Sequence, residues 1–109
     1  MTSRCLMNIE DMRVSANDTA EFLKSMAHPE RLMVLCQLTE GELGFTELLE
    51  GSCLSQSAFS QQLAVLKRKG LVKVRKESQL VFYSLADSRV ELLMSSLHNV
   101  FCQHHNEEK

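Results

Sequence analysis

The sequence predicts a mainly α-helical fold that carries one β-hairpin. Three observations predict it. The 109-residue chain has one Pro and four Gly, few turn residues for a protein of many strands. Apolar residues recur at helical spacing in several segments, and one pair of short segments has the alternation of strands. No apolar run reaches the ~18 residues of a transmembrane helix, and the N-terminus has no apolar segment of the secretory type.

The first helix is expected from Ile9 to Met26, where apolar residues recur at steps of three and four. Pro29 ends it and begins a second helix, because proline is tolerated at the first helical position. The second helix contains the almost wholly apolar run 32–38, so we expect it to be central. It ends before Gly41.

A helix pair with a tight turn follows. Residues 45–50 form a short helix, and Gly51-Ser52-Cys53-Leu54 is a turn. Ser55 is a favoured N-cap for a helix that runs to about Lys69 and ends at Gly70. The residues of that helix expected to face the core are Phe59, Leu63 and Leu66.

Residues 72–76 alternate apolar with basic side chains and 81–85 return, which predicts one hairpin. Ser88 and Glu91 have the spacing of a capping box at the start of a last helix. That helix has more apolar residues than a terminal helix of a small domain needs, so a partner subunit could cover the excess. They are Val90, Leu93, Met94, Leu97, Val100 and Phe101.

The net charge of −2 is divided unevenly along the chain. Residues 51–76 contain no Asp or Glu, and one face of the molecule is therefore expected to be basic. The basic residues of this stretch are Lys67, Arg68, Lys69, Lys73, Arg75 and Lys76.

Together these elements make a winged helix-turn-helix. Such a helix fits the major groove of DNA, where Gln pairs with adenine, and the basic hairpin can lie along phosphates. The candidate DNA-binding residues are Ser55, Gln56, Ser57, Ser60, Gln61 and Lys67 of the helix and Lys73, Arg75 and Lys76 of the hairpin. Two alternatives are a solvated basic surface without a ligand and a module that binds protein.

The stretches 54–72 and 26–32 resemble the recognition helix, and the entry to the second helix, of the ArsR/SmtB family of bacterial repressors. Gln62 departs from the family, in which most members have His. The resemblance covers about residues 16–102. It implies a homodimer built through the first and last helices, a palindromic operator in double-stranded DNA, and an inducer that weakens DNA binding. We expect one domain over 1–109, with flexible tails at 1–7 and 104–109.

The four cysteines include no C-x-x-C pair, so a cytoplasmic protein with reduced thiols is expected. The common metal sites of the family are not matched: residues 45–50 have no thiol, and Arg89 stands where a His is needed. No metal site and no cofactor are predicted. A metal-responsive repressor that uses the face of His98 and Cys102, four residues apart, is an alternative.

Cys36 and Cys102, in their contexts, resemble the thiol pair of the persulfide-sensing branch of the family, of the BigR, SqrR and HlyU type. The resemblance implies that reactive sulfur species or oxidants bridge the two thiols and thereby switch operator affinity. No role is assigned to Cys5 or Cys53. An enzyme is not expected, because no cysteine has an obvious activating partner nearby in the sequence. A small thiol peroxidase is the alternative from another class.

Overall fold

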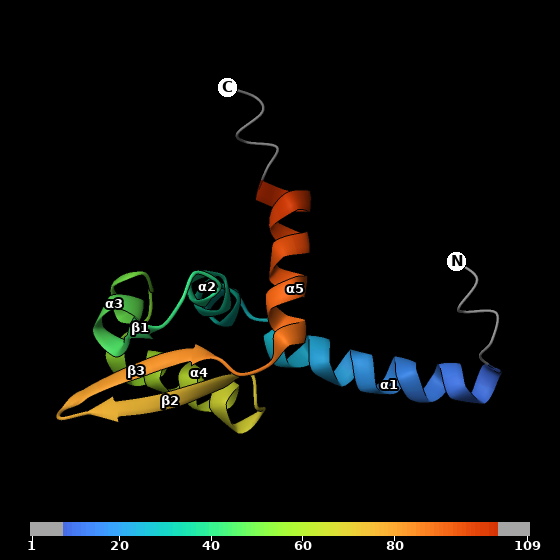
Figure 1. The fold of residues 1–109 in the computed structure, drawn as a ribbon, viewed down its shortest axis with the longest axis horizontal. Helices are drawn as coiled ribbons and strands as arrows, with labels where there is room; N and C mark the ends of the chain where they lie inside the picture. The colour runs from blue at the N-terminus through green and yellow to red at the C-terminus, as the bar shows by residue number, and fades with distance from the viewer. Residues whose placement is uncertain (1–7, 103–109) are drawn as a thin grey trace.

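The structure is a computed structural model that describes residues 8–102, with side chains as far as Phe101. Its elements are α1 (Ile9–Met26), α2 (Pro29–Leu38), β1 (Leu43–Gly44), α3 (Phe45–Glu50), α4 (Gln56–Arg68), β2 (Val72–Glu77), β3 (Leu80–Leu85) and α5 (Ser88–Leu97), followed by a π-helical turn, His98–Cys102 (Figure 1). The mainly helical fold with a hairpin wing is confirmed. The tails expected at 1–7 and 104–109 lie outside the described residues. No helix of the described part is both long and apolar enough to cross a membrane.

Local sequence signals set the helix boundaries around the turn. The side chain of Ser55 accepts a hydrogen bond from the backbone N–H of Ala58 at 3.2 Å and so caps α4. Gly70 follows α4 with φ of +78°, a left-handed conformation that is easy only for glycine. Pro29 is the first residue of α2, and Nδ1 of His28 accepts from the N–H of Glu30 at 3.0 Å.

The sheet has a third strand that the sequence did not predict. The strand order is β1-β3-β2, with both pairs antiparallel. Leu43 lies opposite Tyr83 and Gly44 opposite Phe82, so β1 joins the segment after α2 to the wing. Two residues are too few for an alternating pattern to appear in the sequence.

The predicted capping box at the start of α5 is wrong. Asp87, in an extended conformation, is the N-cap, and Ser88 is the first helical residue. Oδ1 of Asp87 accepts from the backbone N–H of Arg89 at 2.9 Å, and the Arg89 guanidinium also binds this carboxylate. As the cap, the Asp87 carboxylate forms charge-assisted hydrogen bonds with the Arg89 guanidinium, which the uncharged hydroxyl of a Ser cap would not form.

The core lies where α2, α4, α5 and the base of the sheet meet, with α2 at its centre as expected. The three residues predicted to face the core from α4 are all buried. The buried hydrophobic residues are Met26, Val34, Leu35, Leu38, Leu48, Phe59, Leu63, Leu66, Leu71, Val72, Val90 and Met94.

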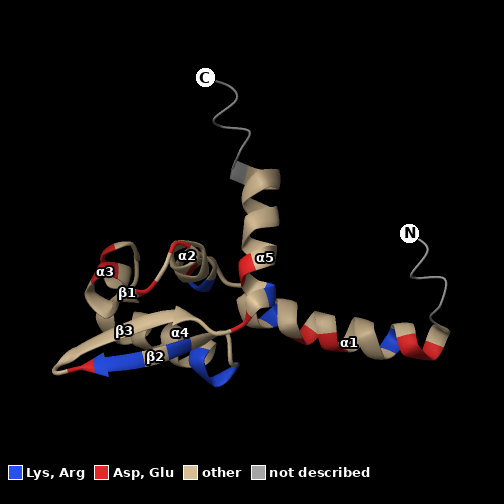
Figure 2. Cartoon of the chain, in the orientation of Figure 1, with Lys and Arg blue, Asp and Glu red and all other residues tan. Residues whose placement is uncertain are grey.

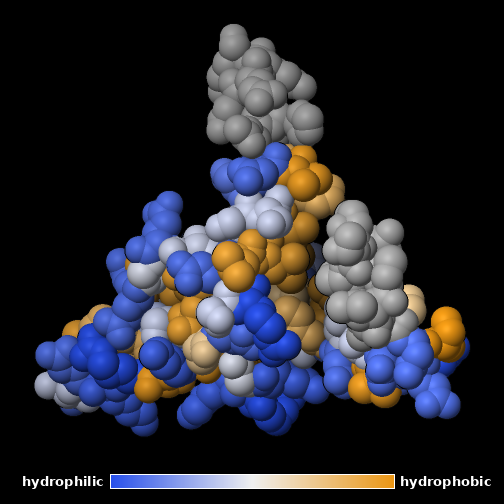
Figure 3. Space-filling model, turned by 45° about the vertical axis from the view of Figure 1, so that its right-hand side comes forward, coloured by the Kyte–Doolittle hydropathy of each residue, from blue (hydrophilic) through white to orange (hydrophobic). Residues whose placement is uncertain are grey.

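Two helices project from this core. Figure 1 shows α1 and α5 leaving the body of the molecule as separate arms. The radius of gyration is 16.4 Å, against about 13 Å for a compact domain of this size. Hydrophobic side chains gather along the α5 arm (Figure 3). The large exposed ones on α1, α5 and the π turn are Ile9, Met12, Val14, Leu23, Leu92, Val100 and Phe101.

Candidate DNA-binding surface and thiol groove

The outer face of α4 is polar and exposed along its N-terminal half. The buried stripe of Phe59, Leu63 and Leu66 holds the opposite face against the core. This leaves the predicted base-reading residues accessible to a ligand. The exposed residues are Ser55, Gln56, Ser57, Ser60 and Gln61.

Positive charge gathers at the C-terminal end of α4 and on β2. In Figure 2 the basic end of α4 and the strand β2 lie along the same side of the molecule, whereas acidic residues mark α1, α2 and α3. Lys67, Lys73 and Lys76 are exposed. A polar helix face flanked by exposed lysines is the combination that a DNA duplex requires, since phosphate contacts fix the position and base contacts the sequence.

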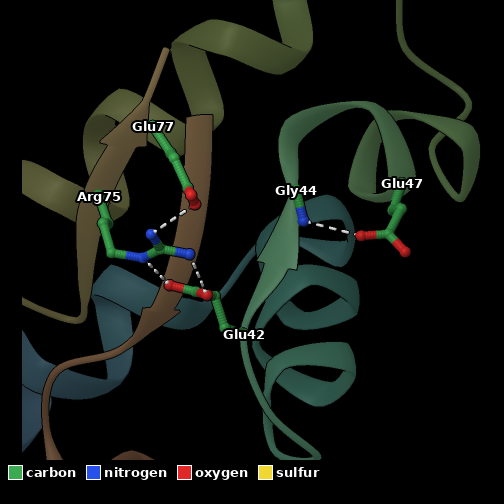
Figure 4. Close-up of polar contacts among 5 residues, drawn as sticks. All are labelled: Glu42, Gly44, Glu47, Arg75 and Glu77. Atoms are coloured by element: carbon green, nitrogen blue, oxygen red, sulfur yellow. Dashed lines mark hydrogen bonds and ion pairs between the residues drawn. The ribbon is translucent and has the colours of Figure 1, made fainter. Parts of the chain in front are cut away.

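Arg75 differs from the other predicted wing cations, because carboxylates surround its guanidinium. Nε and Nη2 donate to the two oxygens of Glu42 at 2.9 and 2.8 Å, and Nη1 donates to Glu77 at 3.0 Å (Figure 4). The guanidinium also lies 4.7 Å from the centre of the Phe82 ring. Hydrogen bonding from Arg75 lowers the pKa of Glu42, and the two carboxylates raise the pKa of Arg75. The Arg75 side chain therefore fastens the wing to the segment before β1.

The end of β1 fixes the start of α3, because Gly44 is the N-cap of that helix. Oε1 of Glu47 accepts from the N–H of Gly44 at 2.9 Å (Figure 4). Gly44 is also paired with Phe82 in the sheet. The strand β1 therefore connects the helix pair α3–α4 to the wing and supports both. Sequence reasoning missed this support, which joins residues far apart in the chain.

Gln62 has a partner on α2. Its Oε1 accepts from Nη1 of Arg31 at 2.7 Å, and Nε of Arg31 donates to the carbonyl oxygen of Ser25 at 2.8 Å. Both contacts are part-buried. Glutamine at this position, where most members of the family have His, therefore accepts a side-chain hydrogen bond from α2.

Cys36 lies on the exposed side of α2, at a groove between α2 and α5. Its Sγ is 3.8 Å from Sδ of Met94. The groove has a volume of about 510 Å³ and is lined by Cys36, Thr39, Glu40, Met94, Ser95, His98 and Asn99. Cys36 is therefore not a buried core residue, the role most common for a cysteine within an apolar helix.

Cys102 ends the π-helical turn that begins at His98, one of the groove residues. The Cys102 side chain and Cys5 lie outside the described part of the structure. Cys53 is exposed in the turn before α4. Among the described side chains, no three His, Cys, Asp or Glu residues are arranged to hold a metal ion.

Comparison with known proteins decides the family. The model for "bacterial regulatory protein, arsR family" matches residues 28–74. The transcriptional activator HlyU of Vibrio cholerae is 44% identical over 89% of this chain and 90% of its own length. The chain belongs to the arsR family. The biofilm growth-associated repressor of Xylella fastidiosa is 40% identical over 88% of this chain and 84% of its own length.

A solved structure has the same fold. The transcriptional regulator HlyU from Vibrio vulnificus superposes with a TM-score of 0.81 at 44% identity, covering 88% of this chain and 100% of that one. The expected family and its HlyU/BigR branch are confirmed. As a member of the arsR family the chain is a transcriptional regulator and not an enzyme, so the thiol-peroxidase alternative is set aside.

Proposed function

We propose that the chain acts as a homodimer that binds a palindromic operator in double-stranded DNA, in the cytoplasm. Two observations carry this proposal: α4 has an exposed polar face, and its basic end lies along the same side of the molecule as the basic strand β2 (Figure 2). In the proposed complex Ser55, Gln56, Ser57, Ser60 and Gln61 face base edges, and Lys67, Lys73 and Lys76 neutralise phosphates. Arg75 holds the wing in shape.

The apolar arms support a second copy as the partner. Leu92 of α5 and Leu23 of α1 are 71% and 48% exposed, and both line a groove between the two helices. Exposed apolar patches of this kind mark protein interfaces. Two copies related by a two-fold axis would cover both arms and present two α4 helices to two half-sites.

Salt dependence tests the DNA-binding part. A dimer that contacts about eight phosphates loses on the order of 10³- to 10⁵-fold in affinity between ~50 and ~200 mM salt. Anisotropy of a labelled duplex, selected from a random pool by the chain itself, measures this loss. A protein-binding module would select no duplex, and an affinity that does not change with salt would contradict the proposal.

We further propose that Cys36 and Cys102 switch the operator affinity. The groove supports this, because Cys36 is exposed on α2 while the turn ending at Cys102 begins beside the same groove at His98. The Cys36 thiolate attacks a sulfane sulfur of an inorganic polysulfide, which leaves one sulfur shorter, and a persulfide remains on Cys36. The Cys102 thiolate then attacks the Cys36 sulfur and expels hydrosulfide, leaving a disulfide.

Serine variants test the switch. Cys36→Ser should bind the selected duplex as wild type does and stop responding to polysulfide, because the attacking thiol is gone. Cys53→Ser is the matched control, since Cys53 is also exposed and lies next to α4. It should keep the full response. If Cys36→Ser still changes its affinity under polysulfide, the proposed switch is wrong.

A further inference from the structure

One arginine connects the end of α1 to the middle of α4. Nε of Arg31 donates to the carbonyl oxygen of Ser25, in the last turn of α1, at 2.8 Å. Nη1 of the same guanidinium donates to Oε1 of Gln62, on α4, at 2.7 Å. The guanidinium is a rigid planar fork, so its two bonds fix the position of Gln62 relative to Ser25 more tightly than two independent side chains would.

The residue before Arg31 holds the turn that leads into α4. Oγ of Ser52 donates to Oε1 of Glu30 at 2.7 Å, and the N–H of Leu54 donates to the same Oγ at 3.0 Å. The first turn of α2 thus holds α4 at two separate places, its entry and its middle. Together with the buried stripe of Phe59, Leu63 and Leu66, these two contacts limit how far α4 can turn on the core.

In the proposed dimer α1 belongs to the interface and α4 to the DNA. The angle between α1 and α4 then determines how far apart the two α4 helices stand. DNA is strict about this distance, because half-sites must recur at about one helical turn, ~34 Å, to face the same side of the duplex. A side chain that fixes the angle between α1 and α4 is therefore expected to control which half-site spacing the dimer accepts.

We propose that Arg31 and Gln62 are positioning residues for operator recognition, which set the half-site spacing by fixing α4 relative to the end of α1. The proposal rests on the proposed DNA-binding function. Gln62 is part-buried against α2, whereas its neighbour Gln61 is exposed, so the two adjacent glutamines have different tasks. Gln61 faces the DNA, and Gln62 holds the helix that presents it.

The test compares spacing preferences. Gln62→Met keeps the size of the side chain and removes the acceptor; Arg31→Lys keeps the charge and removes the fork. The probes are the duplex selected by wild type, versions whose centre is one or two base pairs longer or shorter, and a shuffled duplex. Gln37→Met is the matched control, because Gln37 donates to the carbonyl of Met33 within its own helix. Thermal melting confirms that each variant folds.

For Gln62→Met we expect the preference for the selected spacing to fall about tenfold, the size of effect that one hydrogen bond to a charged group supports. Affinity for the shuffled duplex and the salt slope should stay as in wild type, because the phosphate contacts are unchanged. Gln62→Glu keeps an acceptor for Arg31 and should keep the spacing preference, although its added charge lowers affinity for every duplex. Gln37→Met should behave as wild type.

Two results would overturn the proposal while leaving the DNA-binding function intact. In the first, Gln62→Met loses affinity equally on all duplexes, the shuffled one included, which would make Gln62 a support of folding alone. In the second, Gln62→Met and Arg31→Lys both keep the full spacing preference. A wild type that selects no duplex at all is a different outcome, since it removes the DNA-binding function and this proposal with it.

Discussion

Replacing Lys73 and Arg75 separately by Gln distinguishes a wing cation that contacts DNA from one that holds the wing together. Lys73 and Arg75 are two positions apart on β2, so their side chains lie on the same face of the strand. Both are exposed. Their surroundings differ. The Arg75 guanidinium makes three hydrogen bonds to Glu42 and Glu77, and one positive and two negative charges give this group a net charge of −1.

The expected magnitude follows from counterion release. A lysine that neutralises one phosphate in each half-site adds about 1.8 to the slope of log K against log salt concentration, twice the ~0.9 of one contact. Lys73→Gln should reduce the magnitude of this slope by about 1.8. The affinity that the variant loses over a fourfold rise in salt is then ~12-fold smaller than the loss in wild type. Arg75→Gln should change the slope by much less. Glu42→Gln should raise DNA affinity, because the cluster with Arg75 and Glu77 becomes neutral.

The assay is anisotropy of the selected duplex at a series of KCl concentrations. Lys24→Gln is the matched control, because Lys24 is an exposed lysine on α1 that pairs with Glu21 at 3.5 Å. It should leave the slope unchanged. If Arg75→Gln lowers the slope as much as Lys73→Gln does, Arg75 leaves its carboxylates for a phosphate on binding, which would contradict its role as a support of the wing.

Three further predictions concern other parts of the molecule. Gln56→Ala should cost about 1–3 kcal/mol on the selected duplex and almost nothing on a shuffled one, measured by anisotropy; equal losses on both would make Gln56 a phosphate anchor. Leu92→Asp should shift the equilibrium toward a folded monomer in sedimentation, since Leu92 is 71% exposed in the single chain; an unchanged dimer would place the interface elsewhere. Hydrogen bonding from Arg89 lowers the pKa of Asp87, so this carboxylate stabilises the fold above the ordinary pKa of Asp, and the contribution is lost as the pH falls through the lowered value. Asp87→Asn keeps an N-cap but cannot titrate, so its free energy of unfolding should fall less steeply below about pH 4 than that of wild type. An equally steep fall in both proteins would contradict the assignment.

The sequence predicted those elements whose signals are local. Pro29, Ser55 and Gly70 each act on their own backbone, and the helices begin and end beside them. At α5 two neighbouring residues, Asp87 and Ser88, are both able to cap. In the structure Asp87 is the cap, and the Arg89 guanidinium binds its carboxylate, a contact that a pattern of single residue types does not reveal.

The candidate site was predictable in its residue types but not in its pairings. The exposed face of α4 follows from the helical period, which places the polar residues opposite Phe59, Leu63 and Leu66. The contacts from Arg75 to Glu42 and from Arg31 to Gln62 join residues 33 and 31 positions apart. Only the packed chain brings them together, so both the bracing role of Arg75 and the positioning role of Arg31 required the structure.

A single polysulfide treatment tests whether Cys36 and Cys102 together switch the DNA-binding dimer. The most direct measurement treats the reduced protein anaerobically with polysulfide, then divides the sample between peptide mapping by mass spectrometry and titration of the selected duplex. We predict a peptide pair joined through Cys36 and Cys102, with two hydrogens lost or whole sulfur atoms gained, and a changed DNA affinity in the same sample. A changed affinity with both thiols still free, or a cross-link that leaves affinity unaltered, would contradict it.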